Sequence, residues 1–195
     1  MTMQTSGPLT EANLSTMNRP LAWLVDRGLG ESRSMDFDMD QPYQRGDVWG
    51  LVRRQNLIRS LIMGIPIASL VINVRHLADF HEPGYSDARD AAYAIVDGKQ
   101  RVTTIMMFSR DEFAVPASWF REGSVETTED TEDGPYVRYS GLTPTGRRRF
   151  ENKPLATSEG RFSTLADERM IFDLVNFGGV AQGASDVDAA APAGR

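Results

Sequence analysis

The chain has 195 residues, 41% of them hydrophobic and 25% charged, and these values are typical of one soluble domain with a hydrophobic core. It contains no cysteine, which excludes disulfides, thiolate catalysis and cysteine-based zinc sites. The net charge of −6 excludes binding of nucleic acid across the whole surface, and no apolar run reaches the roughly 18–20 residues of a membrane helix. Because no secretory signal is visible either, we expect a cytoplasmic protein that does not contact a membrane, and its oligomeric state stays open.

The first predicted elements are a short helix and a half-buried strand. Residues 1–18 are polar and have little to bury, so we expect a flexible N-terminus. Residues 20–27 (PLAWLVDR) have a proline at the start and Gly28 after the end, which predicts a helix. Residues 35–40 (MDFDMD) alternate apolar and acidic side chains, which indicates a strand, and Pro42 stops that strand.

A longer helix and a second strand follow. Asp47 can cap a helix over residues 48–63, and Gly64 followed by Pro66 ends it. Residues 69–74 (SLVINV) are rich in valine and isoleucine and predict a strand. The helix is expected to bury one side, formed by Val48, Leu51, Val52, Gln55, Ile58, Leu61 and Ile62.

Residues 76–92 are polar and predict a surface loop. The two histidines of the chain, His76 and His81, lie in this loop beside Asp79 and Glu82. Their spacing is a poor metal signature, so we expect a solvated loop and no metal site.

The next segment allows two structures after a buried strand over residues 93–96. Asp97 and Gly98 form a favoured two-residue hairpin turn, so residues 102–108 can be a second strand. The last four of those residues are all apolar, however, whereas a half-buried strand would alternate. One helical stripe instead collects Val102, Ile105, Met106 and Ser109. We therefore predict a strand, a glycine turn and a helix.

The chain is less regular after this helix. Residues 122–133 are acidic and we expect them to be exposed, while residues 136–139 indicate a strand. Residues 143–150 predict the start of a helix, with Pro144 in its first turn. The strongest basic run lies there, and it is either a solvated helical face or a contact to a phosphate backbone; it consists of Arg147, Arg148 and Arg149.

A last helix is predicted over residues 166–176. Thr164 is a suitable N-cap, and Gly178 and Gly179 close the helix. Its apolar side is formed by Met170, Ile171, Leu174 and Val175. Residues 182–195 are rich in alanine, glycine and aspartate, which predicts a disordered tail. We thus expect one compact α+β domain over residues 19–181, with a small mixed sheet and helices packed around it.

The polar residues between the strand and the helix suggest an anion site. A helix that begins after a glycine turn presents free backbone N–H groups and a positive dipole end, which suit phosphate. Gly98 allows close approach of the backbone, and Lys99 and Arg101 can neutralise phosphate charge. Asp97 is an acceptor for a metal ion, a ribose hydroxyl or water, and the remaining polar groups are Gln100, Thr103 and Thr104. The alternative is an ordinary turn with solvated charges.

A second polar cluster precedes the long helix. Gln41, Tyr43, Gln44 and Arg45 lie in a proline-containing loop before Trp49. This cluster is either a surface loop in which the aromatic rings pack against the core, or a wall of the same pocket. In the second case the tyrosine stacks on a ligand and the arginine pairs with phosphate.

Taken in order, these motifs resemble one family. They are Pro-Tyr-Gln-Arg with Val-Trp, a helix ending Leu-Ile-x-Ser-Leu-x-x-Gly-x-Pro-Ile, Ile-Val-Asp-Gly-x-Gln-Arg-x-Thr-Thr and Phe-x-x-x-Asn-x-Gly-Gly. The chain resembles the N-terminal domain of GmrSD-type modification-dependent restriction enzymes (domain-of-unknown-function family 262) of the ParB/sulfiredoxin-like superfamily. The resemblance covers residues 37–179 and is loose over residues 110–163.

The resemblance implies a ParB/sulfiredoxin-like fold that binds a nucleoside triphosphate, with Mg²⁺ as an expected companion, and that hydrolyses it in several members. Carried over by motif, the catalytic or phosphate-contacting residues are Asp97, Gln100 and Arg101. The implied nucleotide-binding residues are Tyr43, Gln44, Arg45, Gly98, Lys99, Thr103, Thr104 and Asn176.

Two departures from the family pattern limit what the resemblance implies. Lys99 stands where the family commonly has glutamine. Full-length restriction members also carry a nuclease domain that depends on histidine and asparagine, and we expect no such domain in this chain. Sulfiredoxin activity is excluded because the cysteine nucleophile is missing.

Three functions therefore stay open at this stage. The first is a stand-alone nucleoside triphosphatase. The second is a non-catalytic ParB-like module that binds nucleotide, contacts DNA directly or through a partner, and regulates or accompanies a nuclease. The third is a degenerate domain that makes only protein contacts.

Overall fold

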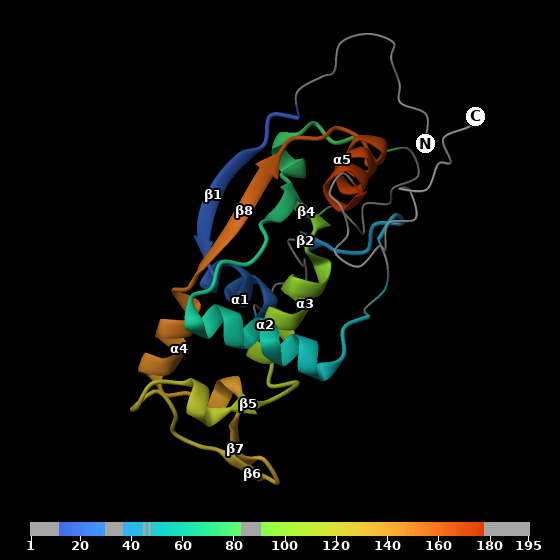
Figure 1. Cartoon of the computed structure of the whole chain (residues 1–195). Helices are drawn as coiled ribbons and strands as arrows, with labels where there is room; N and C mark the ends of the chain where they lie inside the picture. The colour runs from blue at the N-terminus through green and yellow to red at the C-terminus, as the bar shows by residue number, and fades with distance from the viewer. Residues whose placement is uncertain (1–11, 30–36, 45, 47, 83–90, 178–195) are drawn as a thin grey trace, which may run out of the picture.

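The computed structural model describes residues 12–29, 37–44, 46, 48–82 and 91–177, and its strands form two sheets (Figure 1). The larger sheet has the order β1-β8-β3-β4-β2, and it is mixed because β3 runs parallel to β8 and antiparallel to β4. Its strands are β1 (Ser15–Pro20), β2 (Phe37–Asp38), β3 (Leu70–Asn73), β4 (Tyr93–Asp97) and β8 (Pro154–Gly160). The predicted α+β fold, a small mixed sheet with helices packed around it, is confirmed.

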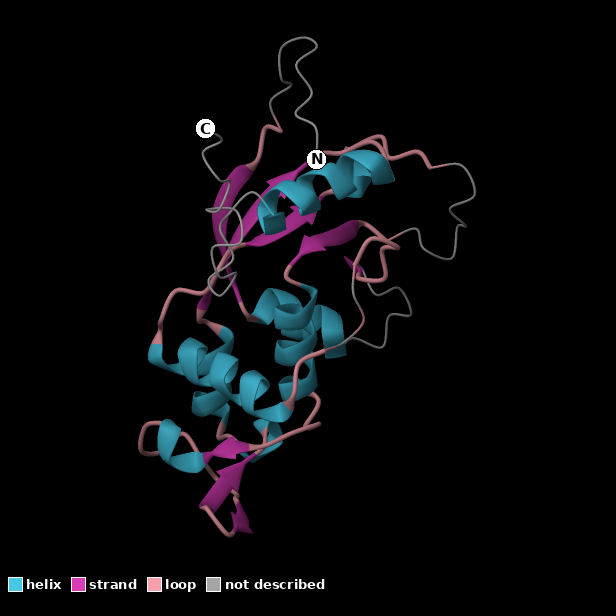
Figure 2. Ribbon diagram, turned by 45° about the vertical axis from the view of Figure 1, so that its right-hand side comes forward, coloured by secondary structure: helices cyan, strands magenta, loops and turns pink. Residues whose placement is uncertain are grey.

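Side-chain alternation in the central strands separates the helices onto two faces of this sheet. Leu70 and Ile72 join the large core, to which four helices also contribute residues. Val71 and Val96 point the other way and pack against Ile171. The helices of the first face are α1 (Ala22–Leu29), α2 (Leu51–Met63) and α3 (Lys99–Ser109), and that of the second is α5 (Leu165–Phe177). Figure 2 shows this single helix separated by the sheet from the other helices.

A small second sheet and one more helix extend the large core. The sheet has the order β5-β7-β6, with β5 (Val115–Pro116), β6 (Glu129–Thr131) and β7 (Gly134–Val137). The predicted helix is α4 (Pro144–Glu151), and Thr143 caps it by accepting the N–H of Gly146 at 3.0 Å. β6 is exposed, as predicted for this acidic segment, and β7 begins two residues before the strand expected at 136–139.

Helix α3 confirms the choice between the two structures considered for the segment after β4. A hairpin is absent, and the helix begins directly after Gly98. All four residues of the predicted stripe are buried. The non-alternating apolar run was therefore the informative signal, because a helix of this length buries a continuous stripe.

Helix α2 differs from its prediction in its start and in its buried side. It begins at Leu51, with Gly50 as the N-cap, and Asp47 lies outside the described residues. Gly64 ends the helix in the left-handed conformation, as expected. Three residues of the predicted buried side are exposed instead, namely Val48, Leu51 and Val52. The buried side is rotated and includes Arg54, whose guanidinium donates to Trp49 O and Thr104 Oγ1.

The structure also differs from the predictions near both ends of the described chain. The expectation of a flexible segment over residues 1–18 is wrong for Ser15–Asn18, because these residues belong to β1 and pair antiparallel with β8. Helix α1 runs through Gly28 to Leu29, so this glycine does not end it. On α5 only Ile171 of the predicted apolar side is buried, while Met170, Leu174 and Val175 are exposed. The predicted closing glycines and the tail over 182–195 lie outside the described residues.

No helix among the described residues is long and apolar enough to cross a membrane.

Candidate functional site

The start of α3 requires a glycine. Gly98 has φ +104°, a conformation that residues with a Cβ rarely adopt. A Cβ built there would also lie 2.3 Å from Leu70 Cδ2 on the neighbouring strand. No side chain of the described part of the chain caps this end. The N–H of Arg101 bonds back to Gly98 O at 2.9 Å, whereas the N–H groups of Lys99 and Gln100 have no acceptor among the described residues.

Two cations flank this uncapped start, and each is held by a carboxylate. Lys99 Nζ donates to Asp40 Oδ1 at 3.0 Å, and Arg101 Nη2 donates to Asp97 Oδ2 at 2.6 Å. Arg101 also donates through Nη1 to Ala68 O. The side chains of Lys99 and Arg101 are only 18% and 12% exposed, whereas that of Asp40 is 77% exposed. The cations are thus oriented at the helix start, and the lysine's partner lies in solvent.

The neighbouring polar residues of α3 make contacts within the protein. The amide of Gln100 accepts the N–H of Val48 at 3.3 Å and donates to Gly46 O at 3.0 Å, which ties the preceding loop to the helix. Thr104 is buried and donates to Gln100 O at 2.7 Å. Thr103 is half-buried and is not among the residues that line the adjoining cleft.

The loop before α2 contributes Tyr43 and Gln44 to the lining of the cleft beside the start of α3. Gln44 Nε2 donates to Val96 O at 2.9 Å and also to Ile95 O, so the side chain is anchored to β4. The ring of Tyr43 lies 5.3 Å from that of Phe172, centroid to centroid, and its hydroxyl donates to Glu168 Oε2 at 3.1 Å. Arg45 lies outside the described residues.

These elements enclose a cleft of about 800 Å³ between the start of α3, the loop before α2 and helix α5. Of the predicted site residues, the cleft brings together Tyr43, Gln44, Asp97, Gly98, Lys99, Gln100, Arg101 and Asn176. Its described lining carries four cationic side chains and two carboxylates, namely Arg53, Lys99, Arg101 and Arg169 with Asp97 and Asp173. The local charge is therefore positive although the whole chain carries −6.

Several lining residues were not predicted. Trp49 was expected to be near the site, but Arg53 was not, and its guanidinium carbon lies 4.5 Å from the centroid of the Trp49 ring. Phe172 entered the prediction only as part of a motif, and Arg169 and Asp173 not at all. Along α5, Phe172 and Asp173 lie three or four residues after Arg169 and three or four residues before Asn176, which places all of them on one face of the helix. This spacing is the sequence signal that could have identified them.

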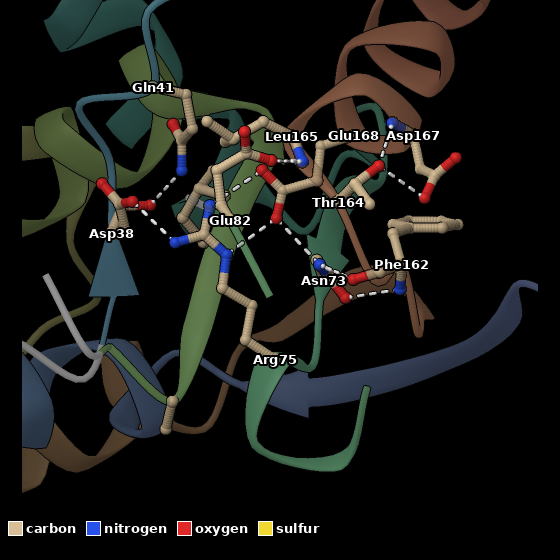
Figure 3. Close-up of polar contacts among 12 residues, drawn as sticks. Asp38, Gln41, Asn73, Arg75, Glu82, Phe162, Thr164, Leu165, Asp167 and Glu168 are labelled. Carbon is tan, nitrogen blue, oxygen red and sulfur yellow. Dashed lines mark hydrogen bonds and ion pairs between the residues drawn. The ribbon is translucent and has the colours of Figure 1, made fainter. Parts of the chain in front are cut away.

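A buried ionic network supports the cleft from behind, and the sequence analysis missed it (Figure 3). Glu168 is fully buried and accepts from Arg75 Nε and Nη2, each at 2.8 Å, and from Asn73 Nδ2 at 2.8 Å. Arg75 also donates through Nη1 to Asp38 Oδ2 at 2.7 Å. The only sequence signal is that Glu168 lies three residues before the buried Ile171, on the same side of α5.

Burial within this network acts on Tyr43. Removal from solvent, followed by the negative charge of Glu168 and its hydrogen bond, strongly raises the pKa of the Tyr43 hydroxyl. Tyr43 therefore stays protonated and donates to Glu168 throughout the physiological range. As a result it presents its ring to the cleft, while its hydroxyl faces the network.

A protein-only metal site is not visible in the described residues, where no group of three or more His, Asp or Glu side chains could hold an ion. His76 Nδ1 is 2.9 Å from Ala92 O, and its ring packs edge-on against Tyr93. The His76 ring is thus held by contacts within the protein.

Comparison with known proteins identifies a family. A family model described as "GmrSD restriction endonuclease, N-terminal domain" matches residues 29–187 of the chain. No curated protein matches the chain, and no solved structure does.

Proposed function

The chain belongs to the GmrSD restriction endonuclease N-terminal domain family, and we propose that its cleft binds a nucleoside triphosphate. The observation that carries the proposal is the start of α3. This helix begins without a cap at a left-handed glycine, between two oriented cations, and it opens into a cleft of about 800 Å³. A volume of this size lies within the range of about 300–1,000 Å³ that is usual for small-molecule sites.

The phosphates bind at the α3 end of the cleft. There the free N–H groups of the first turn and the helix dipole attract an anion, and Lys99 and Arg101 add full positive charges. Asp40 is mostly exposed, so its ion pair with Lys99 contributes little and a phosphate oxygen can replace the carboxylate. Arg101 keeps its hold on Asp97 and donates its remaining N–H groups to the ligand.

The base and sugar occupy the rest of the cleft. The rings of Tyr43 and Phe172 offer one apolar wall, and Trp49 with Arg53 offers another. Bases stack well on aromatic rings and on guanidinium planes regardless of their sequence. Asn176, on the α5 side of the cleft, lies within reach of a ligand's polar edge.

The donor set also fits a Mg²⁺ ion that arrives with the nucleotide. Mg²⁺ is usually held by one or two carboxylates together with substrate phosphates, and Asp97 and Asp173 both line the cleft. When bound, the ion would neutralise charge on the phosphates. The residues of the chain bind and orient the triphosphate in either case.

Calorimetric titration with ATP, CTP, GTP and UTP, with and without Mg²⁺, tests this function. We expect saturable binding of at least one nucleotide, weakened about tenfold or more by Arg101→Ala because a charge-assisted contact to phosphate is lost. Arg148→Ala is the matched control, since Arg148 is exposed and does not line the cleft. Background heat with all four nucleotides would refute the proposal.

Binding without turnover is the second candidate, and a specific observation favours it. The two side chains best suited to orient a hydrolytic water, Asp97 and Gln100, are both engaged, one by Arg101 and the other by the loop before α2. Such a domain would act as a nucleotide-dependent partner of a nuclease in a restriction system. Phosphate release measured beside the titration separates the two, because tight binding with background release selects the second candidate.

A further inference from the structure

A second, smaller pocket lies at the far end of α2 from the cleft. Helix α2 has 13 residues and is therefore about 20 Å long. Trp49 and Arg53, near its start, line the cleft, whereas Ile62, in its last turn, lines the second pocket. The two cavities share no lining residue among those described. The small pocket is thus a separate feature of the surface.

Its floor is apolar and its rim is cationic. The floor is formed by Ile62, Phe120 and the buried Phe150. Three cations border it, namely Arg121, Arg149 and Lys153, and no aspartate or glutamate is among its described lining residues. The nearest acid on α4, Glu151, accepts a hydrogen bond from the hydroxyl of Tyr139. The positive charge of the rim is therefore not balanced within the pocket.

The rim is preformed by contacts within the protein. Arg149 Nη1 donates to Ser124 Oγ at 3.0 Å, and Lys153 Nζ donates to Ile62 O at 2.9 Å, where the end of a helix attracts a cation. Each head group uses one donor in this way and keeps others for a ligand. Gly146 packs so closely on Ser124 that a Cβ would lie 2.2 Å from Ser124 O, which fixes the wall between them.

The size of the pocket selects its occupant. A volume of about 200 Å³ is smaller than a cofactor or nucleotide site, whose usual range begins at about 300 Å³. It is suited to a single large apolar side chain. Met63 and Ile65, which directly follow the pocket-lining end of α2, are 62% and 48% exposed and extend the apolar surface beyond the pocket. A phosphate backbone would use the cations but would leave this apolar floor and its surroundings unfilled.

We infer that this pocket is a docking site for an acidic segment of a protein partner, which inserts one large apolar side chain between carboxylates. The apolar residue fills the floor as an anchor, and the flanking acids pair with Arg121, Arg149 and Lys153. The positive rim requires a negatively charged partner segment, and the volume of the pocket has room for one large apolar side chain. The inference does not depend on nucleotide binding, because the cleft lies at the other end of α2.

Fluorescence anisotropy of the full chain with short labelled peptides tests the site. The probe has a central phenylalanine flanked on both sides by Asp and Glu, with leucine and tryptophan versions beside it. One control peptide has alanine at the centre, and another has Asn and Gln in place of the acids. We expect saturable binding of an acidic, apolar-centred probe and a loss of about tenfold or more with either control, since both the anchor and the charges contribute.

Variants of the chain locate the binding. The double variant Arg121→Gln with Arg149→Gln is expected to bind the probe about tenfold more weakly. Arg148 is an exposed neighbour outside the pocket, so Arg148→Gln is expected to change the affinity less than about twofold. Circular dichroism and thermal unfolding establish that both variants fold. Absence of saturable peptide binding, or an equal loss with Arg148→Gln, overturns the inference. So does tight binding of duplex DNA that the double variant abolishes while no peptide binds, because the surface then serves nucleic acid.

Discussion

Helices α3 and α5 both begin among charged side chains, but the two starts are built differently. At α5 the Thr164 hydroxyl accepts the N–H of Asp167 at 3.1 Å and donates to its carboxylate at 2.7 Å, and Glu82 Oε2 accepts the N–H of Leu165 at 3.1 Å (Figure 3). At α3 no side chain in the described part of the chain caps the first turn. The first start is capped by the protein itself, and the second is the one at which we propose that a ligand binds.

The charged side chains beside the two helix starts also differ, because those of the network at α5 are buried and one pair at α3 is exposed. Next to α5, Arg75, Asp38 and Glu168 are buried and joined to one another by several hydrogen bonds. Next to α3, Lys99 is paired with an exposed carboxylate that solvent or a ligand can replace. A buried ionic network is costly to break, whereas an exposed pair is nearly neutral. The comparison teaches that polar clusters with similar composition can be built differently: the cluster at α5 is joined internally and holds the fold, and the cluster at α3 is the one that our proposed function assigns to a ligand.

The largest expected effect comes from breaking the buried network. Arg75→Met removes the cation that the buried carboxylates of Asp38 and Glu168 share, together with its hydrogen bonds to both. We expect the free energy of unfolding to fall by about 3–5 kcal/mol, measured by urea denaturation. Arg169→Met is the control, because Arg169 follows Glu168 on α5 but is 67% exposed. A loss below about 1 kcal/mol for Arg75→Met would show that the network does not hold the fold.

The next effect tests the start of α3 directly. Gly98→Ala is expected to lower the free energy of unfolding by about 1–3 kcal/mol, because alanine is strained at φ +104° and its Cβ meets Leu70. Nucleotide affinity is expected to fall with it, since the first turn of α3 must shift. Gly64→Ala shares a positive φ of 75° but has nothing within 4 Å of its Cβ, so it isolates the conformational part of the loss. Equal losses at the two positions would argue against a tight contact at Gly98.

A smaller effect is expected at the link between the network and the cleft. Tyr43→Phe removes one hydrogen bond to Glu168 but leaves its bonds from Arg75 and Asn73, so stability at neutral pH falls by only about 1 kcal/mol. The pH dependence is more informative. Because the pKa of Tyr43 is raised in the folded chain above the value of about 10 in the unfolded chain, its contribution is complete below pH 10 and is lost as the pH rises further.

Denaturation at several pH values between about 8 and 11 measures this contribution. The wild type is expected to lose stability more steeply above pH 10 than Tyr43→Phe does. Tyr136→Phe is the control, because Tyr136 lies on β7 in the small sheet, away from the network. Parallel curves for the wild type and Tyr43→Phe would contradict the buried, protonated state of Tyr43.

The difference between the two helix starts also explains why the sequence predicts the start of α3 but not the buried network. The glycine turn, its cations and α3 follow from a contiguous stretch, because a left-handed glycine and a helical stripe are local patterns. The network joins β2, the segment after β3 and α5, which are far apart in the chain, and no local pattern pairs Asp38 with Arg75. Periodicity likewise shows which residues of α5 share a side but not whether another element covers it, so the exposure of Met170 and Leu174 could not be predicted.

The smallest expected effect comes from the exposed ion pair between Asp40 and Lys99 at the start of α3. Asp40→Asn removes the carboxylate that competes with phosphate for Lys99, and Asp40 is so exposed that the ion pair contributes little to stability. We therefore expect an unchanged free energy of unfolding and nucleotide binding about two to three times tighter, measured by calorimetry at low salt, where the charge effect is greatest. Asp130→Asn is the control, since it makes the same charge change on exposed β6. If Asp40→Asn instead weakens nucleotide binding, the carboxylate helps to hold Lys99 in its binding position. The Asp40–Lys99 pair would then be a fixed ion pair, like those of Arg75 in the buried network, and phosphate would not replace it.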